Sequence, residues 1–118
     1  FKGEKFFREI EEKITLNLLK KKKIILALGG GAFMNKNIRK EILNNHTSFW
    51  LDLDNETIID RINKSAKRPL ALNSTKAELL DMLKKRSYFY SKALYKVNCN
   101  NLTKIEIVKK VIKIYENN

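Results

Sequence analysis

Cysteine is nearly absent from this sequence, and that scarcity excludes two kinds of stabilising site. The 118 residues contain a single cysteine, Cys99, so the chain can form no internal disulfide. One cysteine also supplies no metal-ligand cluster, and we expect no metal site in this chain. We therefore predict that Cys99 is a small apolar core residue in a protein of the reducing cytosol.

Long apolar segments are absent as well. No run approaches the ~20 residues that cross a bilayer, and nothing near Phe1 resembles a signal peptide. We expect no membrane association. Hydrophobic residues nevertheless make up 43% of the chain, which is enough to build a core in about one small domain.

Acidic residues are scarce relative to basic ones, and the net charge is +12. Such a charge suits a polyanionic partner such as nucleic acid. The 20 lysines, 13 asparagines and 13 isoleucines, however, indicate codon usage in DNA rich in A and T. Because the aromatic residues lie among aliphatic ones in periodic stretches, we expect no nucleic-acid partner.

Three short segments are typical of β-strands. Residues 24–28 are all apolar and too few for a helix, which predicts a strand buried on both faces of a parallel sheet. Residues 48–53 and, more weakly, 97–99 predict two further strands. Helices alternate with these strands, so the predicted class is α/β with a parallel sheet and flanking helices.

Helices are predicted from apolar periodicity and from capping residues. Asp54 can cap one helix, and Thr75 with Glu78 and Thr103 with Glu106 have the spacing of capping boxes. We expect helices over residues 4–19, 36–43, 55–62, 75–93 and from 104 to the end of the chain.

Arginine is rare, because lysine supplies four in five of the basic residues. Four of the five arginines, Arg8, Arg61, Arg68 and Arg86, flank motif-like features, where the planar fork of a guanidinium could be needed. They could also be residual surface charges. Arg86 lies on or beside the inward stripe of its helix, so it needs a partner, either a bound carboxylate or phosphate or a structural acidic residue.

The few glycines and the single proline mark two loops. Gly29, Gly30 and Gly31 follow a predicted strand and precede a helix, where ligands bind in open α/β sheets. The run matches neither G-x-G-x-x-G nor G-x-x-x-x-G-K-[ST], and three glycines can also simply make a turn. Residues 63–73, around Arg68 and Pro69, read as a polar loop that could close as a lid.

Four blocks of residues follow one another along the chain. They are Gly3-Glu4-x-x-Phe7-Arg8-x-x-Glu11, Ala27-Leu28-Gly29-Gly30-Gly31-Ala32, Arg68-Pro69-Leu70-Ala71 and Arg86-x-x-x-Tyr90-x-x-Ala93. In order and approximate spacing, this pattern resembles the shikimate kinases over almost the whole chain. The resemblance implies a P-loop kinase of the nucleoside-monophosphate-kinase type, which phosphorylates the 3-hydroxyl of shikimate with ATP and Mg²⁺.

The resemblance also implies roles for individual residues. Arg8 and Arg86 would bind the shikimate carboxylate, and Gly30, within the run Gly29 to Gly31, would contact the ring hydroxyls. Arg68 would be the catalytic lid arginine that reaches the ATP phosphates, and Arg61 would pack beside adenine. By the same likeness we expect a monomer in the cytoplasm.

Two parts of the family pattern are missing from this sequence: the phosphate-binding Walker loop and the Asp-x-Asp that follows it. Asp52-x-Asp54 stands at a different place, and we interpret it as a strand end and a helix cap. We therefore expect residues 1–118 to be the C-terminal portion of a single domain that lacks its first two strands. Alone, the chain is expected to be unstable and inactive, with the Mg²⁺ ligands in the missing part.

Two alternatives stay open at the level of sequence. A different small-molecule P-loop kinase, similar to a gluconate kinase, would also use arginines for a carboxylate-bearing acceptor. A non-catalytic basic remnant would instead bind nucleic acid in a salt-sensitive way.

Overall fold

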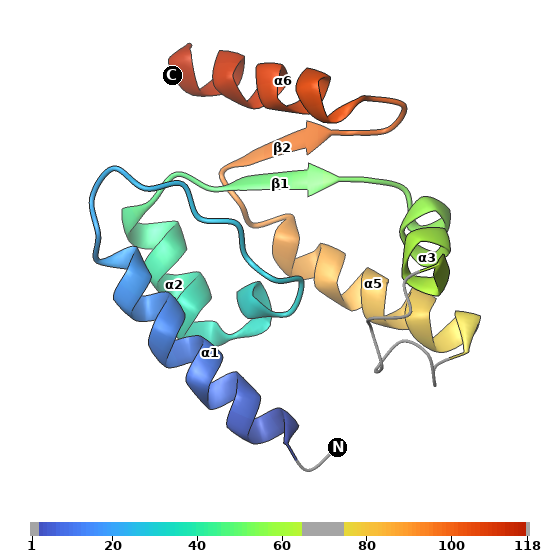
Figure 1. Ribbon diagram of the computed structural model, residues 1–118, viewed down its shortest axis with the longest axis horizontal. Coiled ribbons are helices and arrows are strands. Elements are labelled where there is room, and N and C mark those ends of the chain that lie inside the picture. Colours follow the sequence, from blue (N-terminus) through green and yellow to red (C-terminus); the bar gives the residue numbers. More distant parts are fainter. Residues whose placement is uncertain (1–2, 65–74, 118) are drawn as a thin grey trace. The chain divides into compact units, whose positions relative to one another are not determined.

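A computed structural model describes residues 3–64 and 75–117 of the chain (Figure 1). The chain divides into two compact units, Phe1–Ser48 and Phe49–Asn118. No helix within the described ranges is both long and apolar enough to cross a membrane.

The first unit consists of helix α1 (Glu4–Leu19), the short 3₁₀ helix η1 (Ala32–Met34) and helix α2 (Lys36–Asn45). Figure 1 shows α1 and α2 side by side. The apolar residues of this unit that are buried include Leu19, Ile38 and Ile42. Both predicted helices are confirmed, and α2 extends two residues beyond the predicted end because Asn44 and Asn45 continue its turn.

The predicted strand at residues 24–28 is wrong for the structure as described. The segment has no regular secondary structure, and the side chain of Ile25 is fully exposed. Among the described residues, the sheet contains two strands, and both lie in the other unit. A strand requires a hydrogen-bonded neighbour, so an apolar run without one stays an extended loop.

The sheet of the second unit pairs β1 (Phe49–Asp52) with β2 (Tyr95–Asn98) in parallel, from Phe49 opposite Tyr95 to Asp52 opposite Asn98. The rings of Phe49 and Tyr95 are 5.3 Å apart across the pair. The pairing continues past the strand ends, because the amide of Cys99 donates to the carbonyl of Asp52 at 2.8 Å. The two predicted strands and the parallel arrangement are confirmed, with β2 beginning two residues earlier than expected.

Helices α3 (Asn55–Lys64) and α5 (Lys76–Tyr90) pack together in the second unit. Their contact buries Ile59, Leu79 and Leu83. The predicted end of α5 at residue 93 is wrong. The chain leaves the helix after Tyr90, because the amide of Ala93 bonds back only three residues, to the carbonyl of Tyr90 at 2.9 Å.

The predicted cap of α3 and both capping boxes are confirmed. Asp54 accepts hydrogen bonds from the amide and the hydroxyl of Thr57 at 2.9 and 2.8 Å. Thr75 and Glu78 exchange reciprocal bonds at the start of α5. The same arrangement begins helix α6 (Lys104–Glu116), where Thr103 is the capping residue.

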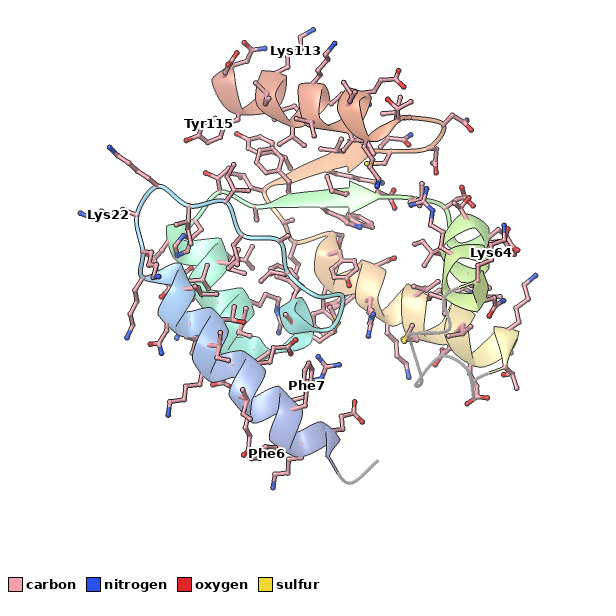
Figure 2. All side chains as sticks on the ribbon, in the orientation of Figure 1. Phe6, Phe7, Lys22, Lys64, Lys113 and Tyr115 are labelled. Carbon is pink, nitrogen blue, oxygen red and sulfur yellow. The ribbon has the colours of Figure 1, made fainter. Side chains whose placement is uncertain are left out.

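Helix α6 carries an apolar stripe that remains exposed. It contacts β2, and Lys110 Nζ donates to the carbonyl of Asn98 at 3.2 Å. Figure 2 shows Lys113 on the side of α6 that faces away from β2. The exposed apolar side chains of the helix are Ile105, Val108, Ile112 and Tyr115. Exposed stripes of this size are typical of a surface that packs against further structure.

Candidate functional site

Arg8 is held in place by an acidic residue of its own helix. Its Nη1 donates to Glu11 Oε1 at 2.8 Å, and spacing of three residues puts both side chains on one face of α1. The two side chains are 34% and 16% exposed, so the pair is partly shielded from water. A guanidinium carries five N–H donors in a fixed fork. Because Glu11 accepts from one nitrogen, donors remain for a second carboxylate.

The guanidinium of Arg8 lies directly against the backbone of Gly31. A Cβ atom at residue 31 would lie 2.6, 2.7 and 2.9 Å from Nη1, Nη2 and Cζ of Arg8, so the guanidinium would have to move to make room for it. The backbone angles of Gly31, φ −94° and ψ −11°, are accessible to every residue type. A side chain at residue 31 and the Arg8 guanidinium in its present position therefore exclude each other.

Gly29 differs from Gly31 in this respect. A Cβ at residue 29 would lie 3.8 Å from Oε2 of Glu11, an ordinary van der Waals distance. The amide of Ala32 bonds to the carbonyl of Gly29, and the amide of Met34 bonds to that of Gly31, both at 3.1 Å. The glycine run thus leads directly into the hydrogen bonds of η1, and its last residue forms the contact with Arg8.

Glu12 connects α1 to the start of α2, just beyond the glycine run. Its carboxylate accepts from the side-chain amides of Asn35 and Asn37 at 2.8 and 3.0 Å. These bonds, that from Asn35 first, hold the pKa of Glu12 below its usual value. Asn35 in turn caps α2 by accepting from the amides of Asn37 and Ile38.

The contributions of Glu11 and Glu12 were not predicted from sequence. Glu11 stood in the quoted pattern without a role, although a carboxylate three residues after an arginine on a helix is a recognisable signal. No comparable signal identifies the partner of Glu12, because Asn35 lies 23 residues away.

Arg86 lies on α5 of the second unit and is half-buried, as predicted. Burial raises the pKa of Tyr90, and the charge of Arg86 and its hydrogen bond with the tyrosine oppose that rise. The Tyr90 ring also lies 6.0 Å from the ring of Trp50, between centroids. Among the described residues of the second unit, Arg86 forms no ion pair with an acidic residue.

Of the two arginines expected to contact the nucleotide, one lies within the described residues. Arg61 lies exposed in the last turn of α3, which continues to Lys64 and so includes the first two residues of the expected lid. Arg68 and the rest of the lid lie outside the described residues. The structure brings Arg8 together with Gly31, in the first unit. A joint grip of Arg8 and Arg86 on one carboxylate stays a prediction.

The Asp52-x-Asp54 pair has the structural role that its position indicated. β1 ends at Asp52, whose carboxylate lies 3.4 Å from Lys96 Nζ, and Asp54 caps α3. The hydrogen bonds from the Thr57 amide and hydroxyl keep the pKa of Asp54 below its usual value. In the parts of the chain that the structure describes, no three His, Cys, Asp or Glu side chains gather as metal ligands.

Comparisons with known proteins agree on one family. A family model described as shikimate kinase matches residues 1–116. The shikimate kinase of Bartonella henselae is 36% identical over 112 residues, which are 94% of this chain and 53% of that protein. That of Bartonella quintana is 34% identical over 116 residues, 98% of this chain and 55% of the relative. The chain thus spans about half the length of these two curated relatives.

A solved structure supports the same fold. The crystal structure of shikimate kinase from Bacteroides thetaiotaomicron matches with a TM-score of 0.76 and 23% sequence identity. The match covers 97% of this chain and 68% of that one. The short parallel sheet with flanking helices is therefore part of a P-loop kinase fold.

Proposed function

Because the chain belongs to the shikimate kinase family, we propose that the enzyme containing it transfers the γ-phosphoryl group of ATP to the 3-hydroxyl of shikimate. In this proposal the chain is the C-terminal portion of a single domain and supplies the acceptor side of the active site. The sequence contains no Walker loop. Residues outside this chain would therefore hold the ATP phosphates and the metal.

The observation that carries the proposal is the contact of Arg8 with Glu11 and Gly31. Glu11 orients the guanidinium, and the absent side chain at residue 31 lets it lie against the glycine backbone. A carboxylate bound by this fork would lie beside backbone groups that can contact hydroxyls. Shikimate carries both a carboxylate and ring hydroxyls, so this juxtaposition suits it as an acceptor.

In the proposed reaction, Arg86 shares the acceptor carboxylate with Arg8. Two guanidinium groups on one carboxylate fix the orientation of the ring, so that one hydroxyl is presented to the γ-phosphorus. Arg68 would stabilise the charge that spreads over the transferring group, as an arginine finger does. Arg61 would pack beside adenine. The protein would act as a monomer in the cytoplasm.

The proposal is tested with a completed enzyme, in which this chain follows the part of the Bartonella henselae shikimate kinase that precedes the matched segment. We expect ADP release that depends on shikimate from the completed enzyme, and none from the 118-residue chain alone. A completed enzyme that unfolds cooperatively but releases no ADP with shikimate would contradict the proposal. A second enzyme, completed from the Bartonella quintana relative, repeats the test with a different junction in case the first fusion does not fold.

The same assay separates the alternatives. A gluconate-kinase-like enzyme would release ADP with gluconate and not with shikimate. A basic remnant would bind nucleic acid in a salt-dependent way and would gain no thermal stability from shikimate.

A further inference from the structure

Arg39, the one arginine that flanks no motif in the sequence, forms two hydrogen bonds to the turn that follows the glycine run. Its Nη1 donates to the carbonyl of Phe33 at 3.0 Å and to that of Met34 at 3.2 Å. These are the last two residues of η1, and Phe33 is buried. Arg39 itself lies in the first turns of α2 and is partly buried.

The position of Arg39 is electrostatically unfavourable for a surface cation. The N-terminal end of a helix carries partial positive charge and favours acidic residues. A chain that uses lysine for most of its basic residues nevertheless has an arginine here. One guanidinium nitrogen carries two hydrogens and can bond two carbonyls at once within a fixed plane. The two carbonyl contacts account for the arginine better than residual surface charge does.

The turn that Arg39 holds is bonded back to the glycine run. The amide of Met34 donates to the carbonyl of Gly31 at 3.1 Å, and the carbonyl of Met34 accepts from Arg39. Gly31 in turn lies against the guanidinium of Arg8. A continuous path of contacts therefore leads from Arg39 through η1 to the proposed acceptor site.

The other side of the turn is held by Glu12. Its carboxylate binds Asn35, the residue directly after η1. α1 carries both Glu12 and Arg8, so η1 is fixed to the helix that presents the guanidinium. The end of η1 is thus bonded to α1 through Glu12 and to α2 through Arg39, so both groups hold the turn in which Gly31 lies against Arg8.

We propose that Arg39 is a positioning residue for the acceptor: it sets the place of Gly31 against the Arg8 guanidinium through the carbonyls of Phe33 and Met34. This inference rests on the proposed function, since the bound molecule is taken to be the carboxylate-bearing acceptor. Arg39 itself touches neither substrate. Its replacement should weaken acceptor binding and leave nucleotide binding unchanged.

The test replaces Arg39 in the completed enzyme. We expect Arg39→Met to raise the KM for shikimate by about tenfold, because sub-ångström to ångström misplacement of a binding group has effects of this order. The KM for ATP should stay within twofold of the parent's value. Arg39→Lys can reach one of the two carbonyls but not both in one plane, so it should raise the KM for shikimate less than Arg39→Met does. It also provides a result if the methionine variant does not fold. Lys40→Met, at an exposed neighbouring position of α2, is the matched control.

A double-mutant cycle distinguishes positioning from a merely structural role. If Arg39 acts through the contact of Gly31 with Arg8, Arg39→Lys should have little further effect on the KM for shikimate once Gly31 is replaced by alanine. Independent, additive effects would overturn the inference, as would an unchanged KM in both Arg39 variants. A parent enzyme that is folded but inactive with shikimate would instead overturn the proposed function, and with it this inference.

Discussion

The guanidinium of Arg8 occupies the space in which residue 31 would carry a side chain, with Nη1 only 2.6 Å from the position of a Cβ on Gly31. The two residues are 23 positions apart, and each is incomplete as a binding group without the other. Arg8 supplies charge, whereas Gly31 permits that charge to lie at the backbone. The relationship leads directly to a prediction about residue 31.

Replacing Gly31 with alanine in the completed enzyme should displace the end of the Arg8 side chain. We expect the KM for shikimate to rise by about ten- to a hundredfold, since the guanidinium would lose its bound position. The KM for ATP should not change. Stability should be little affected, because the backbone angles of Gly31 suit alanine.

Gly29→Ala is the matched control for this experiment. The new Cβ would meet Glu11 Oε2 at 3.8 Å, without a clash. The rise in KM for shikimate should therefore be clearly smaller than that for Gly31→Ala. Equal effects of the two substitutions would contradict the close-approach explanation.

Tyr90→Phe should weaken acceptor binding through Arg86. The change removes the hydroxyl that is hydrogen-bonded to the guanidinium and leaves the ring beside Trp50 in place. Loss of one such bond corresponds to about 1 kcal/mol, or about a fivefold rise in the KM for shikimate. Tyr88→Phe, on an exposed position of the same helix, is the control. If both variants have the parent's KM, Tyr90 does not orient Arg86.

The apolar segment at residues 24–28 should become a strand when its neighbour is present. In the isolated chain Ile25 is fully exposed and the segment is unpaired. Amide hydrogen exchange should therefore be fast at these residues in the 118-residue chain and strongly slowed in the completed enzyme. Equally fast exchange in both proteins would show that the segment is a loop in the whole domain as well.

Acid should destabilise the helix starts of this protein. Hydrogen bonds, first that from the amide of the capping threonine, lower the pKa of Glu78 and of Glu106 from the ordinary value of 4.5. The folded state therefore binds protons at the Glu78 and Glu106 carboxylates less readily than the unfolded state does. Their contribution to stability is complete above about pH 5 and is lost as the pH falls through the lowered values.

Chemical denaturation of the completed enzyme between pH 7 and pH 3 measures this effect. The free energy of unfolding should fall across the acidic part of that range. Glu78→Gln removes the titrating carboxylate, whereas the side-chain oxygen of the glutamine can still accept from the Thr75 amide. The variant should be less stable at pH 7 and should lose less on acidification. An identical pH dependence of the two proteins would argue against a role for the Glu78 carboxylate.

Features that depend on neighbouring residues were predictable from the sequence. The caps at Asp54, Thr75 and Thr103 each involve a partner three residues away, and all three formed as expected. Burial of Cys99, at 5% exposure, was likewise predictable from its apolar character. Burial also raises the pKa of its thiol, as expected for an inert core residue.

The sequence by itself determined the helices, their caps and the residues that mark the family, because each of these depends on local spacing. Only the tertiary structure decided that the Arg8 guanidinium lies against Gly31, which residue fixes the turn after it, and whether residues 24–28 form a strand. Each of those depends on a partner distant in the chain. Glu11 pairs with Arg8 over one helical turn, but the guanidinium meets Gly31 only because the chain folds back, and a strand exists only beside another strand.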